Sequence, residues 1–284
     1  MSALSSGAGD PCGRRVPVPQ WLRFLRRIHG SILLPTLDFL LPADCFACGE
    51  PLGANQHLGA CSVCWAGLAP LKPPVCRACG LPLPAGTDLL GPAGGRCAAC
   101  VLHPGSVDAV QAAVAYDGLA RRFLLRAKSG GRREILGVLG LHLGRSLELS
   151  RFSLGCTIVV PVPSHPWTLL RRGFNPALEL ARPLARLLAL PLRPRLLARR
   201  ITRGTASKGL RLRDRRGAVS SSFLARPMPA RGRVLLIDDV VTTGATVEAC
   251  AEALRARGAV EVRVAAWART LRRDGDMKGG RRIL

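Results

Sequence analysis

The chain has 284 residues, 48% of them hydrophobic and 21% charged, so it can build one large core and a smaller second unit, and its composition excludes wholesale disorder. Its formal net charge of +24 comes almost entirely from arginine, because only four lysines are present. This charge suits phosphate-bearing partners, but the abundance of Arg, Ala, Gly and Pro fits a GC-rich genome equally well. Charge alone therefore does not establish nucleic-acid binding.

The N-terminal residues 1–30 are predicted to form a loose basic tail. Met1–Pro19 lacks the apolar core of a signal peptide. The longest apolar stretch, Ser31–Pro42, has 12 residues interrupted by Pro35 and Asp38, which is too short for a membrane span. We expect a cytoplasmic protein without integral membrane association, although the basic stretch WLRFLRRIHG before Ser31 would suit either a membrane surface or water.

Eight cysteines between residues 45 and 100 form the arrangement C-x2-C…C-x2-C twice. The first set is Cys45, Cys48, Cys61 and Cys64, and the second is Cys76, Cys79, Cys97 and Cys100. Two such turns bring four thiolates to one tetrahedral site, so each set predicts a structural Zn²⁺ site, within a unit that spans residues 31–102. Iron would also suit four thiolates, and disulfides are disfavoured by the expected cytoplasmic location. Cys12, Cys156 and Cys250 fall outside the pattern.

Beyond residue 106 strands and helices alternate, which predicts an α/β domain whose mostly parallel sheet has helices on its faces. The predicted strands are 107–116, 157–163, 232–238 and 260–268. The predicted helices are 118–130, 135–149, 176–190 and 246–258, with a loop between 163 and 176. The polar, basic segment Thr202–Phe223 has no period and exceeds the usual length of a connection, which is typical of a functional lid or of disorder.

Asp238 and Asp239 end a buried strand, where open α/β sheets bind their ligands. Val240–Thr246 is predicted to form a turn in which Gly244 permits positive φ, and the turn leads into a helix N-terminus that suits an anion. A phosphate with vicinal hydroxyls beside it would fit both features. The alternative is a structural connection with an incidental acidic pair. An ATPase would need a G-x-x-x-x-G-K-[ST] loop, which this chain lacks.

The stretch VLLIDDVVTTGAT resembles the phosphoribosyl pyrophosphate (PRPP) binding motif of type I phosphoribosyltransferases. Together with the cysteine sets, the lysine of RRFLLRAKSG and VPVPSHPWTLLRRGFN, it makes the chain from Leu33 to Thr270 resemble the ComF family. These are competence-associated, phosphoribosyltransferase-like proteins with an N-terminal double zinc ribbon. The resemblance implies a type I phosphoribosyltransferase-like domain at residues 106–272, with helices on both faces of its sheet, followed by a basic tail at 273–284.

The resemblance also implies a role for each site residue. Asp238 and Asp239 would contact the ribose hydroxyls, while Lys128 and Arg172 would lie near the pyrophosphate and its Mg²⁺. The 5′-phosphate would be held by Val241, Thr242, Thr243, Gly244, Ala245 and Thr246. The segment 202–223 matches the mobile loop that covers the site in such enzymes. Family members usually have glutamine at the positions of Pro176 and Ser207 and asparagine near Ala218, so these positions depart from the pattern.

Two functions follow. The first is transfer of a phosphoribosyl group from PRPP to an unknown acceptor, with release of Mg-pyrophosphate. The second is a non-catalytic nucleotide or single-stranded DNA binding module that acts in DNA uptake with a helicase partner. Nucleic-acid grooves usually interleave aromatic residues for base stacking, and Arg203–Arg216 contains none, which argues against a single-strand groove in that segment.

Overall fold

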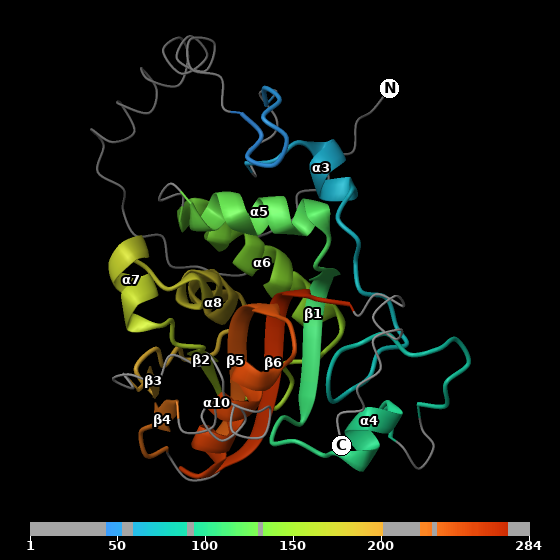
Figure 1. Ribbon diagram of the computed structural model, residues 1–284, viewed down its shortest axis with the longest axis vertical. Coiled ribbons are helices and arrows are strands. Elements are labelled where there is room, and N and C mark those ends of the chain that lie inside the picture. Colours follow the sequence, from blue (N-terminus) through green and yellow to red (C-terminus); the bar gives the residue numbers. More distant parts are fainter. Residues whose placement is uncertain are drawn as a thin grey trace, which may run out of the picture.

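A four-stranded parallel sheet forms the centre of the molecule (Figure 1). The computed structural model describes residues 44–52, 59–89, 94–129, 133–200, 222–228 and 232–271. The strands in spatial order are β1 (Ala109–Ala115), β6 (Ala259–Arg269), β5 (Gly232–Val241) and β2 (Ile158–Pro161). All neighbouring strands run parallel, which confirms the predicted α/β fold.

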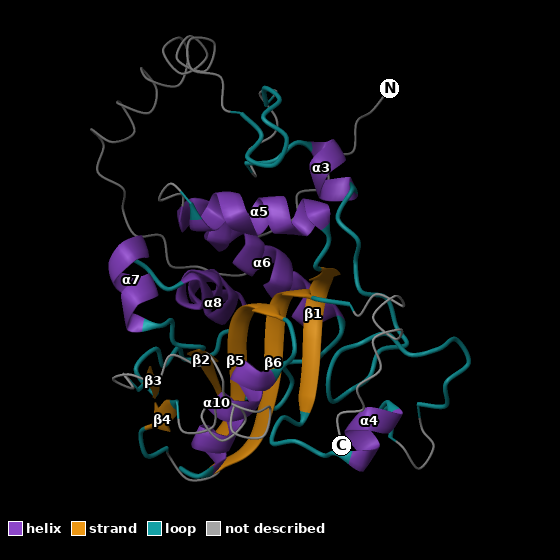
Figure 2. Ribbon diagram, in the orientation of Figure 1, coloured by secondary structure: helices purple, strands orange, loops and turns teal. Residues whose placement is uncertain are grey.

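Helices cover both faces of this sheet, as Figure 2 shows. One face carries α5 (Gly118–Lys128), α6 (Arg133–Leu149) and α8 (Pro176–Leu187). The other carries α10 (Ala245–Arg255) and an antiparallel pair, β3 (Leu197–Arg199) and β4 (Phe223–Ala225). Because side chains alternate along a strand, Leu235 and Ile237 of β5 enter the first core and Val234 and Leu236 enter the second.

Two glycines let α6 and α8 pack with their backbones close together. A Cβ at Gly140 would lie 2.3 Å from the carbonyl oxygen of Leu180, and one at Gly144 would lie 2.8 Å from Cδ2 of Leu187. Helix α8 begins at a cap made by Asn175, with Pro176 in its first turn, where a proline needs no N–H donor. The contact with α6 thus fixes a helix whose first residues lie at the edge of the sheet.

The cysteine-rich segment packs along the outer edge of β1 (Figure 1). The N–H of Leu71 donates to the carbonyl of Ala113 at 3.3 Å, and the N–H of Ala115 donates to the carbonyl of Ala69 at 2.8 Å. Covering an edge strand satisfies backbone groups that would otherwise be open to other chains. Two short helices belong to this segment, α3 (Ser62–Ala66) and α4 (Ala98–Leu102).

The structure differs from the sequence-based expectations in two places. The predicted loop after β2 contains a helix, α7 (Pro166–Arg172), which begins with a proline in its first turn and ends at Gly173 in the left-handed region. Strand β5 continues through the aspartate pair to Val241, because β6 is long enough to pair with it there, with Val241 opposite Arg269. The turn is therefore shorter than predicted.

Several expectations fall on residues outside the described ranges. These are the tails 1–30 and 273–284, the apolar stretch Ser31–Pro42, and most of the predicted lid, including Ser207 and Ala218. The last residue of the predicted lid, Phe223, is described, and it begins β4. Among the described residues, no helix has both the length and the apolar character that crossing a bilayer requires.

Candidate functional site

A cavity of about 220 Å³ opens at the carboxyl ends of β2 and β5. Five residues of the predicted site line it: Lys128, Arg172, Asp238, Asp239 and Thr246. They come from α5, α7, β5 and α10, so the fold brings together residues more than a hundred positions apart. Its position agrees with the general rule that open α/β sheets bind ligands beyond the carboxyl ends of their strands.

The two aspartates reach the cavity from opposite sides of β5. Asp239 forms an ion pair with Lys128 at the end of α5. Asp238 faces the α10 side, near Cys250. Burial, and after it the negative charge of Asp238, raises the pKa of the Cys250 thiol. Backbone N–H groups hold both carboxylates, from Asp239 to Asp238 at 2.8 Å and from Val240 to Asp239 at 2.9 Å. The pair is therefore oriented before any ligand arrives.

Asp238 is held in a setting that disfavours its charge. Burial and, next to it, the negative charge of Asp239 raise the pKa of Asp238 well above its ordinary value. The N–H of Asp239 and the ammonium of Lys128 lower the pKa of Asp238, but by less than these two effects raise it. Further hydrogen-bond donors would stabilise the ionised form of this carboxylate and so lower its pKa.

The predicted phosphate loop lies directly beyond the aspartates. Gly244 adopts φ +88° and α10 begins at the next residue, so the backbone amides of its first turn, which have no carbonyl partner within the helix, lie just beyond the carboxyl end of β5. Thr243 Oγ1 accepts a bond from the N–H of Ala245 at 3.4 Å, while Thr242 and Thr246 are exposed. Val241 is only 3% exposed and is the last residue of β5, so this predicted loop residue is buried in the sheet.

The stretch RRGFN, at residues 171–175, builds a wall of the cavity. Asn175 donates through Nδ2 to the carbonyl of Val162 at 2.9 Å, and its Oδ1 accepts from Ser164 Oγ at 2.9 Å and from the N–H of Ala177 at 3.1 Å. Phe174 is buried, with the guanidinium of Arg133 5.2 Å from its ring centroid. Phe174 therefore has a structural role, whereas Arg172 and Asn175 both line the cavity.

Arg199 also lines the cavity and was not identified from the sequence. It is the last residue of β3, and its guanidinium lies 5.3 Å from the ring centroid of Phe223 in β4. One arginine in a chain so rich in them carries no signal by itself. Its strand is three residues long, too short for periodicity to reveal.

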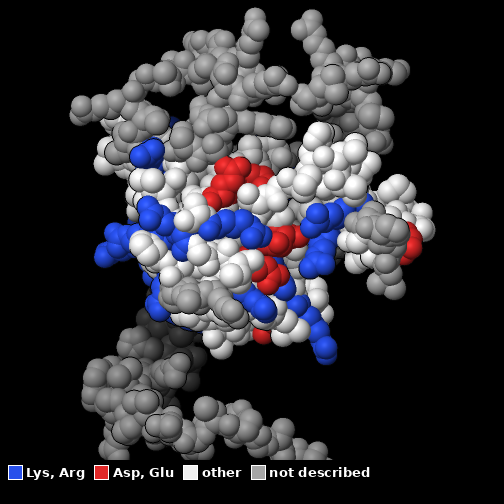
Figure 3. All heavy atoms as spheres, turned by 90° about the horizontal axis from the view of Figure 1, so that it is seen from below, with Lys and Arg blue, Asp and Glu red and all other residues white. Residues whose placement is uncertain are grey.

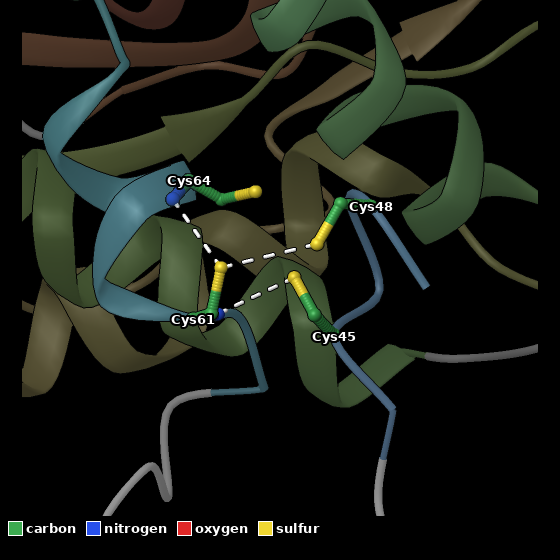
Figure 4. A group of neighbouring side chains, drawn as sticks. All are labelled: Cys45, Cys48, Cys61 and Cys64. Atoms are coloured by element: carbon green, nitrogen blue, oxygen red, sulfur yellow. Dashed lines mark hydrogen bonds between the residues drawn. The ribbon is translucent and has the colours of Figure 1, made fainter. Parts of the chain in front are cut away.

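Each cysteine set forms a compact group of four sulfurs, and Figure 4 shows the first one. The four sulfurs of each group lie within 4.8 Å of one another, with 3.9 Å between Cys48 and Cys61 and 3.9 Å between Cys79 and Cys97. A tetrahedral zinc with Zn–S bonds of about 2.3 Å separates its sulfurs by about 3.8 Å. Both groups therefore fit a zinc-ribbon site, and no disulfide joins the described cysteines.

The two groups repeat the same internal contact. The N–H of Cys61 donates to the sulfur of Cys45 at 3.3 Å, and the N–H of Cys97 donates to the sulfur of Cys76 at 3.2 Å. Burial opposes ionisation of the two accepting thiols, but backbone N–H donors outweigh it, and they lower the pKa of Cys45 to about 6 and of Cys76 to about 7. Thiolates held in this way suit a metal cation.

Family models match both the cysteine-rich part of the chain and the α/β domain. Residues 36–101 match the model of the double zinc ribbon domain, and residues 168–278 match that of the phosphoribosyl transferase domain. The DNA utilization protein YhgH of Salmonella typhi is 32% identical over 236 residues, which cover 81% of this chain and 99% of that protein. Competence protein F of Haemophilus influenzae is 36% identical over 115 residues, 39% of this chain and 49% of that protein.

The chain belongs to the ComF family. The YhgH protein of Escherichia coli K12, at 32% identity over 81% of this chain and 99% of its own length, is a further member. In this ComF-family protein the double zinc ribbon match contains both four-cysteine groups, and the phosphoribosyl transferase match contains Arg172 and the aspartate pair. Lys128 lies outside both matches, and only the fold brings it to Asp239.

Proposed function

We propose that the cavity binds PRPP, or a related phosphoribosyl ligand, together with Mg²⁺. The observation that carries this proposal is the cavity itself, which is lined by an oriented aspartate pair and by Thr246 in the first turn of α10. The phosphoribosyl transferase match over residues 168–278 supports it. The ribbon unit of residues 31–102, with two structural Zn²⁺ ions, and the domain of residues 106–272 complete the proposed organisation.

The ribose would lie over Asp238 and Asp239. Two vicinal hydroxyls donate hydrogen bonds and two carboxylates accept them, so the diol would add donors that stabilise the disfavoured charge of Asp238. The 5′-phosphate would then meet the backbone amides of Thr242–Thr246, where the positive end of α10 favours an anion. Charge-assisted bonds of both kinds are stronger than neutral ones.

The pyrophosphate would face the cations of the same cavity, Lys128, Arg172 and Arg199. Arginine suits this task because its planar fork meets phosphate oxygens in pairs. Mg²⁺ would supply the charge neutralisation that lets pyrophosphate leave. Transfer would break the bond between C1 of the ribose and the pyrophosphate oxygen, which keeps the electron pair, while an acceptor nucleophile forms the new bond to C1.

A second candidate, binding of single-stranded DNA in DNA uptake with a helicase partner, is favoured by one described surface. Trp167 and Leu170 are 72% and 76% exposed on α7, whose last residue lines the cavity. An exposed aromatic beside arginines suits base stacking. The relatives named for DNA utilization and competence agree with this role. On the face seen in Figure 3, however, acidic side chains interrupt the basic ones, so it offers no continuous basic track.

Cysteines that hold zinc rather than form disulfides suit a reducing compartment, and we extend the proposal to a cytoplasmic location.

Calorimetric titration with PRPP and Mg²⁺ tests the first candidate. We expect binding by the wild type and by Glu252→Gln, a control at an exposed acid of α10, and loss of binding when Asp238 and Asp239 are both changed to asparagine. Equal binding by the wild type and the double variant would remove the aspartate pair from the site. For the second candidate, a labelled oligo-dT should bind less well to Trp167→Ala than to Leu149→Ala, a control at an exposed apolar residue.

A further inference from the structure

Arg269, at the end of β6, is the buried charged residue of the described core, with an exposed fraction of 3%. Its guanidinium donates to three carbonyls in two distant segments of the chain, and also to the carbonyl of the neighbouring Thr270 at 3.4 Å. Nε donates to the carbonyl of Cys79 at 2.8 Å, and Nη1 donates to the carbonyls of Val241, at 2.9 Å, and Thr242. The planar fork of arginine can hold several acceptors in fixed directions, and its charge persists at every accessible pH.

Two of these acceptors belong to the start of the proposed phosphate loop. A peptide bond is planar and trans, so a carbonyl and the N–H of the next residue point in opposite directions. Holding the carbonyls of Val241 and Thr242 toward Arg269 therefore turns the N–H groups of Thr242 and Thr243 away from it. Thr270 adds a second donor to Val241, from its N–H at 3.0 Å. These hydrogen bonds to the carbonyls therefore fix the direction in which the loop N–H groups point.

The third acceptor lies in the second cysteine group. Cys79 belongs to the turn Cys76–Gly80, which is fastened to β1, because the carbonyl of Arg77 accepts from the N–H of Val110 at 2.8 Å. A Cβ at Gly80 would lie 3.2 Å from the carbonyl oxygen of Val110, so this turn lies almost on the backbone of the strand. Its geometry depends on the four sulfurs that a zinc ion would join.

We infer that Arg269 is a positioning residue that couples the second zinc site to the phosphate loop. Metal at Cys76, Cys79, Cys97 and Cys100 fixes the Cys79 carbonyl, the carbonyl holds Arg269, and Arg269 orients the loop amides. The ligand side of this inference rests on the function proposed above. Because coupling is reciprocal, a phosphoribosyl ligand should also slow the loss of zinc from this site. The first cysteine group packs instead on α5, with Phe46 and Phe123 in edge-to-face contact 4.8 Å apart.

Backbone ¹⁵N order parameters of residues 242–246, measured by NMR without PRPP on protein prepared with zinc, test the coupling without any ligand. We expect them to fall from about 0.85 to below about 0.6 in Arg269→Lys, which keeps the charge but loses the fork, and in Cys97→Ser. Two matched controls should leave the loop unchanged. Arg263→Lys changes an arginine of the same strand that donates to the carbonyls of Phe152 and Leu154 at 2.7 and 2.9 Å. Cys48→Ser removes a ligand of the first group.

A second experiment measures the affinity for PRPP with Mg²⁺ by calorimetry. We expect about tenfold weaker binding in Arg269→Lys than in Arg263→Lys, which is within the usual range of coupling between sites. Loop order parameters in Arg269→Lys and Cys97→Ser equal to those of their controls would overturn the inference. Wild-type protein that binds no PRPP would overturn the proposed function instead, and the order parameters would still decide whether Arg269 couples the two segments.

Discussion

Gly140 of α6 lies nearly in backbone contact with α8, and we expect Gly140→Ala to destabilise the protein. A Cβ there would lie 2.3 Å from the carbonyl oxygen of Leu180 and 2.9 Å from Cγ of Pro183. Because carbon and oxygen ordinarily approach to about 3.3 Å, the two helices would have to separate by about 1 Å. A helical carbonyl cannot turn aside as the end of a flexible side chain can.

The size of the effect follows from two opposing contributions. Overpacking a core costs about 1–3 kcal/mol, and the upper end applies here because the obstruction is backbone. Alanine gains about 1 kcal/mol over glycine in a helix interior, so the net loss of unfolding free energy should be about 2 kcal/mol. For a protein of this size, that loss lowers Tm by about 4–8 °C.

Gly137 provides the matched control, because it lies one turn earlier in α6 and a Cβ there has no atom within 4 Å. Gly137→Ala should therefore be stabilised by about 1 kcal/mol through helix propensity alone. The difference between the two variants isolates the packing cost, about 3 kcal/mol. Urea denaturation followed by circular dichroism measures both. If Gly140→Ala proves as stable as Gly137→Ala, the close packing of α6 on α8 described above is wrong.

Three further predictions concern the site. Because the pKa of Asp238 is raised above 3.8 in the folded state, the stability that its proton contributes is lost as pH rises through that raised pKa. The Tm of Asp238→Asn should therefore increase relative to wild type as pH rises above about 4, and a constant difference in melts across pH would contradict this. Metal analysis should return two zinc ions per wild-type chain and one for Cys48→Ser, and a full complement in that variant would argue against the first site. Lys128→Met should weaken PRPP binding about 10- to 150-fold in calorimetry, the loss expected for one charge-assisted contact, and an unchanged Kd would place Lys128 outside the ligand site.

The sequence was sufficient for the elements whose patterns are long and repeated. The apolar strand that leads to Asp238 and the paired cysteine turns carry their own signals, and the structure confirms the parallel sheet and the two four-cysteine groups. The helix at Pro166–Arg172 was missed because it has only seven residues and no buried face. A helix of that length is set by its ends, by His165 and by Gly173, rather than by periodicity.

Other features depend on contacts that no local pattern contains. Arg199 and Arg269 are single arginines among many, and they differ only in what the fold places around them. Arg269 meets Cys79, which lies 190 positions earlier in the chain. The end of β5 was placed too early because the aspartates resemble the start of a turn, whereas pairing with β6 continues as far as Val241. The proposed roles of the site residues remain predictions.

The central claim is that the aspartate pair and the loop after β5 hold a phosphoribosyl group. A crystal structure of the protein with PRPP and Mg²⁺ tests it most directly. The account predicts both ribose hydroxyls within hydrogen-bond distance of Asp238 and Asp239, and the 5′-phosphate against the amides of residues 242–246. Ligand bound elsewhere on the chain, or bound here with its ribose turned away from both aspartates, would contradict it.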